Sequence, residues 1–139
     1  MKIVSAIKNI SVLSVCLLGL TAKVNSGPPV TPPPPECEDF LTGGGWITGT
    51  PSGEFANFGV GGGVKNGELW GHLNYIDHAT GMHVKATEVT GYFFVDDDPN
   101  CRIITYNVEI DGAPGTAEVL VCDNGEPGRD DTFTIFLSN

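Results

Sequence analysis

Three histidines in the middle of the chain are the first side chains that could carry chemistry. Neutral imidazole is the commonest protein ligand of transition metals, so His72, His78 and His83 suggest a metal site. The alternation of the residues around them predicts two strands joined by a turn, with His72 and His83 on one face and His78 in the turn. Their spacing matches no zinc signature. The alternative interpretation is a surface histidine, a turn histidine and a cross-strand partner.

A loop near the C-terminus is the second candidate site, because it is rich in oxygen ligands. A calcium ion binds about six to eight such oxygens and is commonly bound by proteins outside cells. The spacing is not that of an EF-hand, and a solvated acidic loop in which Arg129 pairs locally is the alternative. The acidic run Asp96–Asp98 is expected at the same end of the sheet. The candidate calcium ligands are Asp123, Asn124, Glu126, Asp130 and Asp131.

Aromatic side chains give a third candidate, a surface on which a sugar ring could stack. In a small barrel, large aromatic residues more often belong to the core or to an interface, which is the alternative. The candidate ligand-binding residues are Trp46, Trp70, His72 and Tyr92.

The sequence offers no adequate arrangement for catalysis. Ser52 and Ser138 lack the surroundings of a nucleophile elbow. Paired carboxylates occur only in segments expected to be exposed loops, where pKa values are seldom shifted far. We therefore predict that the chain is not an enzyme, with a metal-dependent hydrolase, argued from the acidic loops and the histidines, as the remaining catalytic alternative.

The scaffold expected to position these residues is built from strands alone. Short alternating segments are separated by turn signals such as Asn66-Gly67, and none after the N-terminus has helical apolar spacing. Short connections favour an up-and-down order, and glycines inside strands favour a sheet that curls. We predict an all-β fold, an antiparallel up-and-down barrel or barrel-like sandwich of about seven to eight short strands. The expected strands are Gly43–Thr50, Glu54–Val64, Leu69–Asp77, Met82–Val89, Tyr92–Val95, Cys101–Ile110, Thr116–Cys122 and Thr132–Leu137.

The two strands in the middle of the chain have a predicted register. A loop centred on Ala79 and Thr80 sets apolar residues opposite apolar ones, which is what fixes register in a sheet with one buried face. A bulge at Gly81 would shift the register by one residue. The predicted pairs are Tyr75 with Val84, Leu73 with Ala86, Asn74 with Lys85 and His72 with Thr87.

The N-terminus has the pattern of a secretory signal peptide. Lys2 and Lys8 precede the apolar stretch Ile10–Leu20, which is too short to span a bilayer as a helix. We place the cleavage before Gly27, with a cut after Ala22 as the alternative. An N-terminal strand or helix of the folded domain is the other interpretation. The predicted organisation is a signal peptide over residues 1–26, a proline-rich linker over 27–36 and a single β domain over 37–139.

The charge of the predicted mature chain limits its partners. Removing residues 1–26 leaves four basic residues against all 17 acidic ones, and thus a net charge of −13. This charge argues against nucleic acid, whose phosphates need a basic patch, and against an anionic membrane surface. We expect no transmembrane segment in the mature chain and a secreted location, extracellular or on a bacterial cell surface, with the periplasm as an alternative.

Secretion would place the cysteines where they oxidise. A turn over Asp111–Gly115 puts Cys101 and Cys122 on adjacent strands, offset by about three positions, which a bulge could correct. We predict a Cys101–Cys122 disulfide, with Cys37 either free or bonded to another chain.

Several motifs together resemble a family of bacterial domains. The two long ones are Gly71–Gly81 and Asp123–Phe133, and the short ones are Gly43–Gly45, Phe58-Gly59, Val89-Thr90 and Leu137–Asn139. They resemble the post-COAP type of domain, which occurs in secreted and surface proteins. The resemblance implies location and fold, and it implies no activity or cofactor.

Members of that family usually continue past the Ser-Asn with a further glycine-rich strand. The resemblance therefore implies a sheet that stays open between Gly43–Thr50 and Thr132–Leu137. An open, uncharged edge favours self-association or a partner protein.

Taken together, the sequence favours a secreted or cell-surface structural or adhesive module with no catalytic activity of its own. The alternative is an extracellular ligand-binding barrel that takes a glycan or a small apolar molecule in its mouth.

Overall fold

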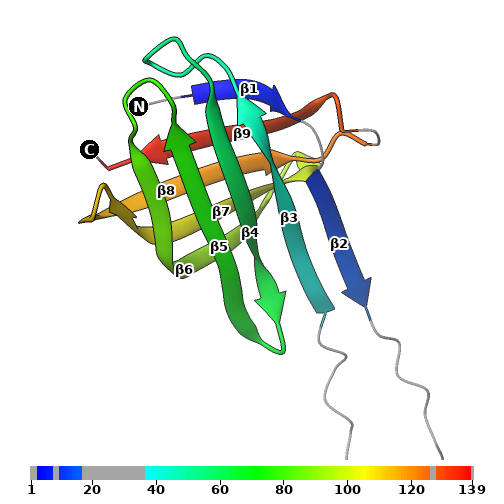
Figure 1. Cartoon of the computed structure of the whole chain (residues 1–139). Coiled ribbons are helices and arrows are strands. Elements are labelled where there is room, and N and C mark those ends of the chain that lie inside the picture. Colours follow the sequence, from blue (N-terminus) through cyan, green and yellow to red (C-terminus); the bar gives the residue numbers. More distant parts are fainter. Residues whose placement is uncertain (1–2, 8–9, 17–36, 126–127, 139) are drawn as a thin grey trace, which may run out of the picture.

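From Cys37 onward, strands that are consecutive in the sequence are hydrogen-bonded to each other, and the sheet curls into a nearly closed barrel (Figure 1). The computed structural model describes residues 3–7, 10–16, 37–125 and 128–138. The predicted all-β, up-and-down barrel is confirmed. The strands are β1 (Ile3–Ile7), β2 (Ile10–Cys16), β3 (Cys37–Ile47), β4 (Ala56–Lys65), β5 (Glu68–Asp77), β6 (His83–Val95), β7 (Asp98–Ile110), β8 (Ala113–Cys122) and β9 (Asp131–Leu137).

Three of the hairpins turn on two residues each, and in two of them both residues have positive φ. Asn66-Gly67 has φ angles of 51° and 76°, and Asp111-Gly112 has φ angles of 52° and 83°. Positive φ at both central residues is the signature of the type I′ turn, whose twist matches that of the flanking strands. The predicted turn over Asp111–Gly115 is therefore too long, because β8 already begins at Ala113.

The tighter turn also corrects the expected offset between the cysteines. With only Asp111-Gly112 in the turn, Cys101 lies directly opposite Cys122 in the β7–β8 register. The predicted disulfide is confirmed, and it needs no bulge.

The predicted register of the β5–β6 hairpin is confirmed near the turn and wrong farther from it. Tyr75 pairs with Val84 and Asn74 with Lys85, but the ladder ends there, so Ala86 and Thr87 have no Cα partner in β5. Beyond Lys85, β6 follows β7 instead, through three register shifts. These shifts let β6 run unbroken to Val95, where the sequence suggested two shorter strands. Other boundaries also moved: β3 begins before Gly43, and Asp98–Asn100, expected in a loop, start β7.

The interior of the barrel is filled by side chains from opposite walls. Phe58 of β4 stacks on Phe133 of β9 with ring centroids 4.0 Å apart. Alternate residues of each strand face this core, which is the period of two expected for strands. The buried apolar residues include Leu41, Ile47, Val60, Leu73, Tyr75, Val84, Ile104, Tyr106, Val108, Val119, Val121, Ile135 and Leu137.

The N-terminal strands occupy the edges that the sequence suggested would stay open. β1 pairs antiparallel with β9, and β2 pairs antiparallel with β3 (Figure 1). β3 and β9 do not pair with each other, so the sheet stays open between them as expected, but with residues 3–16 in place its outer strands are β1 and β2. In this arrangement Cys37 lies opposite Cys16. The expected cleavage before Gly27, and the fate of Cys37 after it, stay predictions, and the expected linker lies outside the described residues.

Within the part of the chain that the structure describes, there is no helix of the length and apolar character needed to cross a membrane.

Candidate functional site

The outer face of β3, β4 and β5 carries the residues that form the best candidate site. Leu41, Phe58 and Leu73 of these strands point into the core, so their neighbours in sequence point outward. The register arranges the outward residues in rows that cross the three strands. From one end to the other, the rows are Phe40–Gly63–Trp70, Thr42–Gly61–His72, Gly44–Gly59–Asn74 and Trp46–Asn57–Ile76.

Glycines of β4 make the middle of this face flat. Across Gly63, which has no side chain, the rings of Phe40 and Trp70 meet edge to face with centroids 5.6 Å apart. The imidazole of His72 lies over Gly61, where an added Cβ would come within 2.7 Å of the ring. At Gly59 an added Cβ would meet nothing within 4 Å, so that position is open to solvent.

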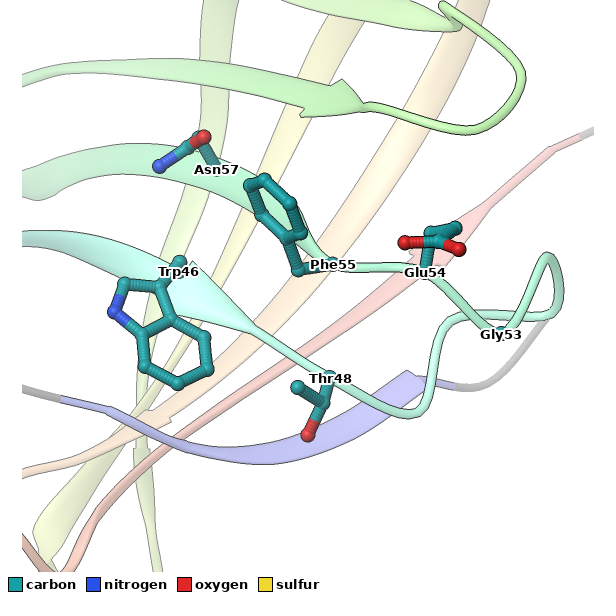
Figure 2. Close-up of a pocket in the computed structure, with 6 residues that line it drawn as sticks. All are labelled: Trp46, Thr48, Gly53, Glu54, Phe55 and Asn57. Carbon is teal, nitrogen blue, oxygen red and sulfur yellow. The ribbon is translucent and has the colours of Figure 1, made fainter.

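A hollow of about 470 Å³ opens at the end of this face where β3 ends and β4 begins. Figure 2 shows Trp46, Phe55 and Asn57 around it, on two neighbouring strands and the loop that joins them. Trp46 is 53% exposed and Phe55 is 45% exposed, which is unusual for side chains of this size. The remaining lining residues are Thr48, Gly53 and Glu54.

Contacts behind the hollow hold two of its lining side chains in place. The ring of Phe55 lies against His78, with centroids 4.6 Å apart. The Nε2 atom of His78 lies 2.5 Å from Oδ1 of Asn57, and Nδ2 of Asn57 donates to the carbonyl oxygen of Gly45 at 3.4 Å. Such contacts lower the entropy that these side chains would lose on binding a ligand.

Asp77 ties the β3–β4 loop to the turn after β5. Its carboxylate accepts hydrogen bonds from Ser52 Oγ and from the backbone N–H groups of Ala79 and Thr80. Burial alone would raise the pKa of Asp77, but these hydrogen bonds lower it below its ordinary value. In the same loop, Thr50 Oγ1 donates to the carbonyl oxygen of Glu54 at 2.6 Å. The loop that lines the hollow is therefore tied to the turn after β5 and braced by a hydrogen bond of its own.

The histidines do not come together as metal ligands. His72 lies over the glycines, His78 is bonded to Asn57, and Nε2 of His83 lies 2.5 Å from Oδ1 of Asn74. Over the described residues, the one group of three or more potential ligands is Asp98 with Cys101 and Cys122. Those two cysteines are joined in the disulfide. A shared site for the three histidines is therefore not formed.

The acidic loop after β8 uses its polar atoms to hold its own shape. Asp131, fully buried, accepts a hydrogen bond from the backbone N–H of Asn124 at 2.9 Å, and Asp123 accepts one from Gly125 at 3.0 Å. Nδ2 of Asn124 donates to the carbonyl oxygen of Asp130. Glu126 lies outside the described residues. Calcium binding here stays a prediction.

The loop after β8 and the start of β7 lie at the same end of the barrel, as the sequence suggested. The backbone N–H of Asp123 donates to the carbonyl oxygen of Asn100 at 3.0 Å, beside the Cys101–Cys122 pair.

Tyr92, expected among the ligand-binding residues, instead points inward and joins a buried ion pair. Its hydroxyl donates to Oδ2 of Asp39 at 2.9 Å, and Nε of Arg102 donates to the same oxygen at 2.8 Å. Burial, followed by this hydrogen bond and the charge of Asp39, raises the pKa of Tyr92 well above its ordinary value.

The other nitrogen atoms of Arg102 also contact groups within the protein. Nη1 donates to the carbonyl oxygens of Pro99 and Cys101, Nη2 lies 3.3 Å from Asp39 Oδ1, and the guanidinium lies 4.2 Å from the centre of the Phe94 ring.

Our sequence reasoning missed Asp39 and Arg102 as partners. A usable signal existed, because each is a charged residue at an inward position of an alternating strand: Asp39 precedes Leu41 by two, and Arg102 precedes Ile104 by two. Charged residues at such positions are almost always paired.

Of the other expected ligand-binding residues, Trp46 lines the hollow, whereas Trp70 and His72 lie along the same outer face. Trp70 is half-buried and its Nε1 atom has no hydrogen-bond partner. Phe55, Glu54 and Asn57 were missed. Asn57 lies directly opposite Trp46 in the β3–β4 register, and the loop between these strands places Glu54 and Phe55 beside them.

A scan against models of protein families, a search of curated proteins and a search of solved structures each found no match.

Proposed function

We propose that this protein is a non-catalytic adhesive module of the cell exterior that binds a neutral polysaccharide on the outer face of β3, β4 and β5. The observation that carries the proposal is the hollow rimmed by two exposed aromatic rings, Trp46 and Phe55. Exposed aromatic surface beside polar groups marks interaction sites, because a soluble chain otherwise buries it.

The chemistry of the lining suits a sugar. The apolar faces of the rings of Trp46 and Phe55 can stack on the C–H faces of a sugar ring. The carboxylate of Glu54, the amide of Asn57 and the hydroxyl of Thr48 supply the acceptors and donors that sugar hydroxyls require.

The face is also long enough and smooth enough for a chain of sugars. From Asn57 to Gly63, β4 spans about 20 Å at the usual rise of about 3.3 Å per residue. Glycines form its floor, and aromatic rings stand at both ends, Trp46 at one and Phe40 with Trp70 at the other.

The strong negative charge favours a neutral polysaccharide over an anionic one, which the protein would repel. The filled interior supports the outer face over the barrel mouth as the binding surface. Phe58 and Phe133 stack where a small apolar ligand would otherwise lie.

Binding to a panel of insoluble neutral polysaccharides tests the proposal. The native protein should sediment with at least one of them, and Trp46→Ala should weaken that binding roughly thirty-fold, as expected for an aromatic anchor worth about 2 kcal/mol. Because Trp46 is half-exposed, the substitution should change the free energy of unfolding by only about 0.5 kcal/mol.

Phe93→Ala is the matched control, since Phe93 is 52% exposed on β6 and does not line the hollow. It should bind the same polysaccharide as the native protein does. Failure of the native protein to bind any member of the panel, or equal binding by Trp46→Ala, would contradict the proposal.

A further inference from the structure

The barrel has one seam, between β3 and β9, where the two neighbouring strands do not pair with each other. All the other neighbours from β3 to β9 are joined by antiparallel ladders. At the seam, β9 pairs with β1 and β3 pairs with β2 instead. We call this seam the β3/β9 gap.

The edge of β9 is rigidly presented to this gap. Phe133 and Ile135 are fully buried in the core, and Leu137 is nearly so, which fixes the strand from Asp131 to Leu137. On the other side, β9 is bonded to β8 over six register pairs, from Ala117–Leu137 to Cys122–Thr132. The backbone groups of β9 that point into the gap therefore need a partner, because unpaired backbone groups at a sheet edge readily take up another strand.

The segment that fills the gap shows what kind of chain fits there. β1 pairs with β9 from Ile3–Ile135 to Ile7–Asp131, and β2 pairs with β3 from Ile10–Gly43 to Cys16–Cys37. Thus two strands that lie close together in the sequence serve the two edges. Its sequence is rich in isoleucine and valine, and Lys8, between the two strands, is its single charged residue.

The same stretch lies within the segment whose pattern predicts a cleaved signal peptide. Cleavage before Gly27 removes both β1 and β2, and it leaves the edges of β3 and β9 facing the gap without partners. The edge strand of a second barrel is held within its own sheet and reaches one of the two edges. An extended segment reaches both, as residues 3–16 do.

We infer that the β3/β9 gap is a strand-binding site, which after removal of residues 1–26 accepts an extended segment that is rich in β-branched residues and carries little charge, donated by another polypeptide. Main-chain hydrogen bonds to the two edges supply the affinity, as in other cases of strand addition. This inference rests on the predicted cleavage and is independent of the proposed polysaccharide binding.

The test uses protein processed and exported by a secreting host, with its N-terminus established by mass spectrometry. A synthetic peptide of residues 3–16, with Cys16 replaced by Ser, should bind it one to one. Binding should slow amide hydrogen exchange in Thr132–Leu137 and Cys37–Gly43. The control peptide carries prolines in place of Val4, Ser5, Val12 and Leu13. Neighbouring prolines are used because only alternate N–H groups of a strand point to one side, and this peptide should bind at least about ten-fold more weakly.

The same four proline substitutions in the full, unprocessed chain give a second measurement. They should speed exchange in Thr132–Leu137 at least about ten-fold while Ile104–Val108, at the centre of the sheet, stays protected.

Three results would overturn the inference. One is export with residues 1–26 still attached, since the gap would then stay filled. Another is processed protein that does not bind the peptide, whether monomeric or associated with a second copy. The last is unchanged exchange in β9 of the proline variant.

Discussion

Two clusters of aromatic and polar side chains lie on opposite sides of the same barrel wall, and they differ in what their polar atoms are bonded to. Inside, the donors and acceptors of Asp39, Tyr92 and Arg102 bind one another, and Arg102 is only 5% exposed. Outside, Trp46 and Phe55 present about half their surface to solvent. A cluster whose bonds are satisfied within the protein stabilises the fold, whereas a cluster that faces solvent is free to bind a ligand.

The largest expected effect comes from the inner cluster. Asp39→Ala removes the partner of a buried guanidinium and should lower the free energy of unfolding by about 3 to 5 kcal/mol, because Arg102 would be left buried and unpaired. Urea denaturation measures this change.

The neighbouring substitution Glu38→Ala is the control, since Glu38 is only partly buried, and it should cost about 0.5 kcal/mol or less. If Asp39→Ala lowered the free energy of unfolding by no more than this control does, Arg102 would be hydrated. The inner cluster would then not stabilise the fold.

The disulfide sharpens the comparison, because it lies on the outer side of the wall and yet is covered. Arg102 faces inward, so the residue before it, Cys101, faces outward. Even so, only 4% of the surface of Cys101 is exposed. The paired substitution Cys101→Ala and Cys122→Ala should lower the free energy of unfolding by about 3 kcal/mol, as expected for a cross-link that closes a loop of 21 residues.

Polysaccharide binding by the double cysteine variant, measured below its melting temperature, should equal that of the native protein. Loss of binding in the folded variant would show that the outer face depends on the far end of the barrel.

Two buried tyrosines give the comparison with the smallest expected change in stability. The two substitutions are closely matched, because each removes only a hydroxyl group. Tyr106 donates its hydroxyl to the carbonyl oxygen of Gly61 at 2.8 Å, whereas the hydroxyl of Tyr75 is buried without a partner. Tyr106→Phe should therefore cost about 1 kcal/mol of stability. Tyr75→Phe should leave stability unchanged or raise it by about 1 kcal/mol. Thermal unfolding at neutral pH compares the two, and an equal loss in both would contradict the assigned hydrogen bonding.

Tyr75 also gives a test in alkali. Burial, with a smaller contribution from the charge of Asp77, raises the pKa of Tyr75 to about 12. In the unfolded chain this phenol ionises near pH 10, so its contribution to stability is complete below about pH 10 and is lost as the pH rises to about 12. Tyr75→Phe should lose less stability than the native protein across that interval. A steeper loss in the variant would show that the phenol is already ionised in the folded protein.

Local signals in the sequence were sufficient for the strands and most of the turns. The alternation around Leu73 and Tyr75 predicted a strand with one buried face, and Asn66-Gly67 predicted a two-residue hairpin. Both are decided by the sterics of a few neighbouring residues. The Cys101–Cys122 pair followed from the same logic, although the turn at Asp111-Gly112 proved tighter than expected.

The candidate site was only partly visible from the sequence. Trp46 was expected to bind ligand and lines the hollow, but Tyr92 was expected beside it and lies inside the barrel. The expected strands treated Tyr92–Val95 as separate from Met82–Val89. Two of the three register shifts along β6 precede Tyr92, and because each reverses which residues face outward, the two cancel and Tyr92 faces inward as Val84 does.

By itself, the sequence determined an all-β chain, its hairpins and its disulfide, because strand faces and tight turns depend on contacts between residues that are near in sequence or adjacent in a hairpin. Only the tertiary structure decided the partners that meet when the sheet curls. Asp39 and Arg102 are 63 residues apart, and β1 at the N-terminus pairs with β9 near the C-terminus. The closing of the barrel sets those contacts, and it depends on the summed twist and bulges of every strand.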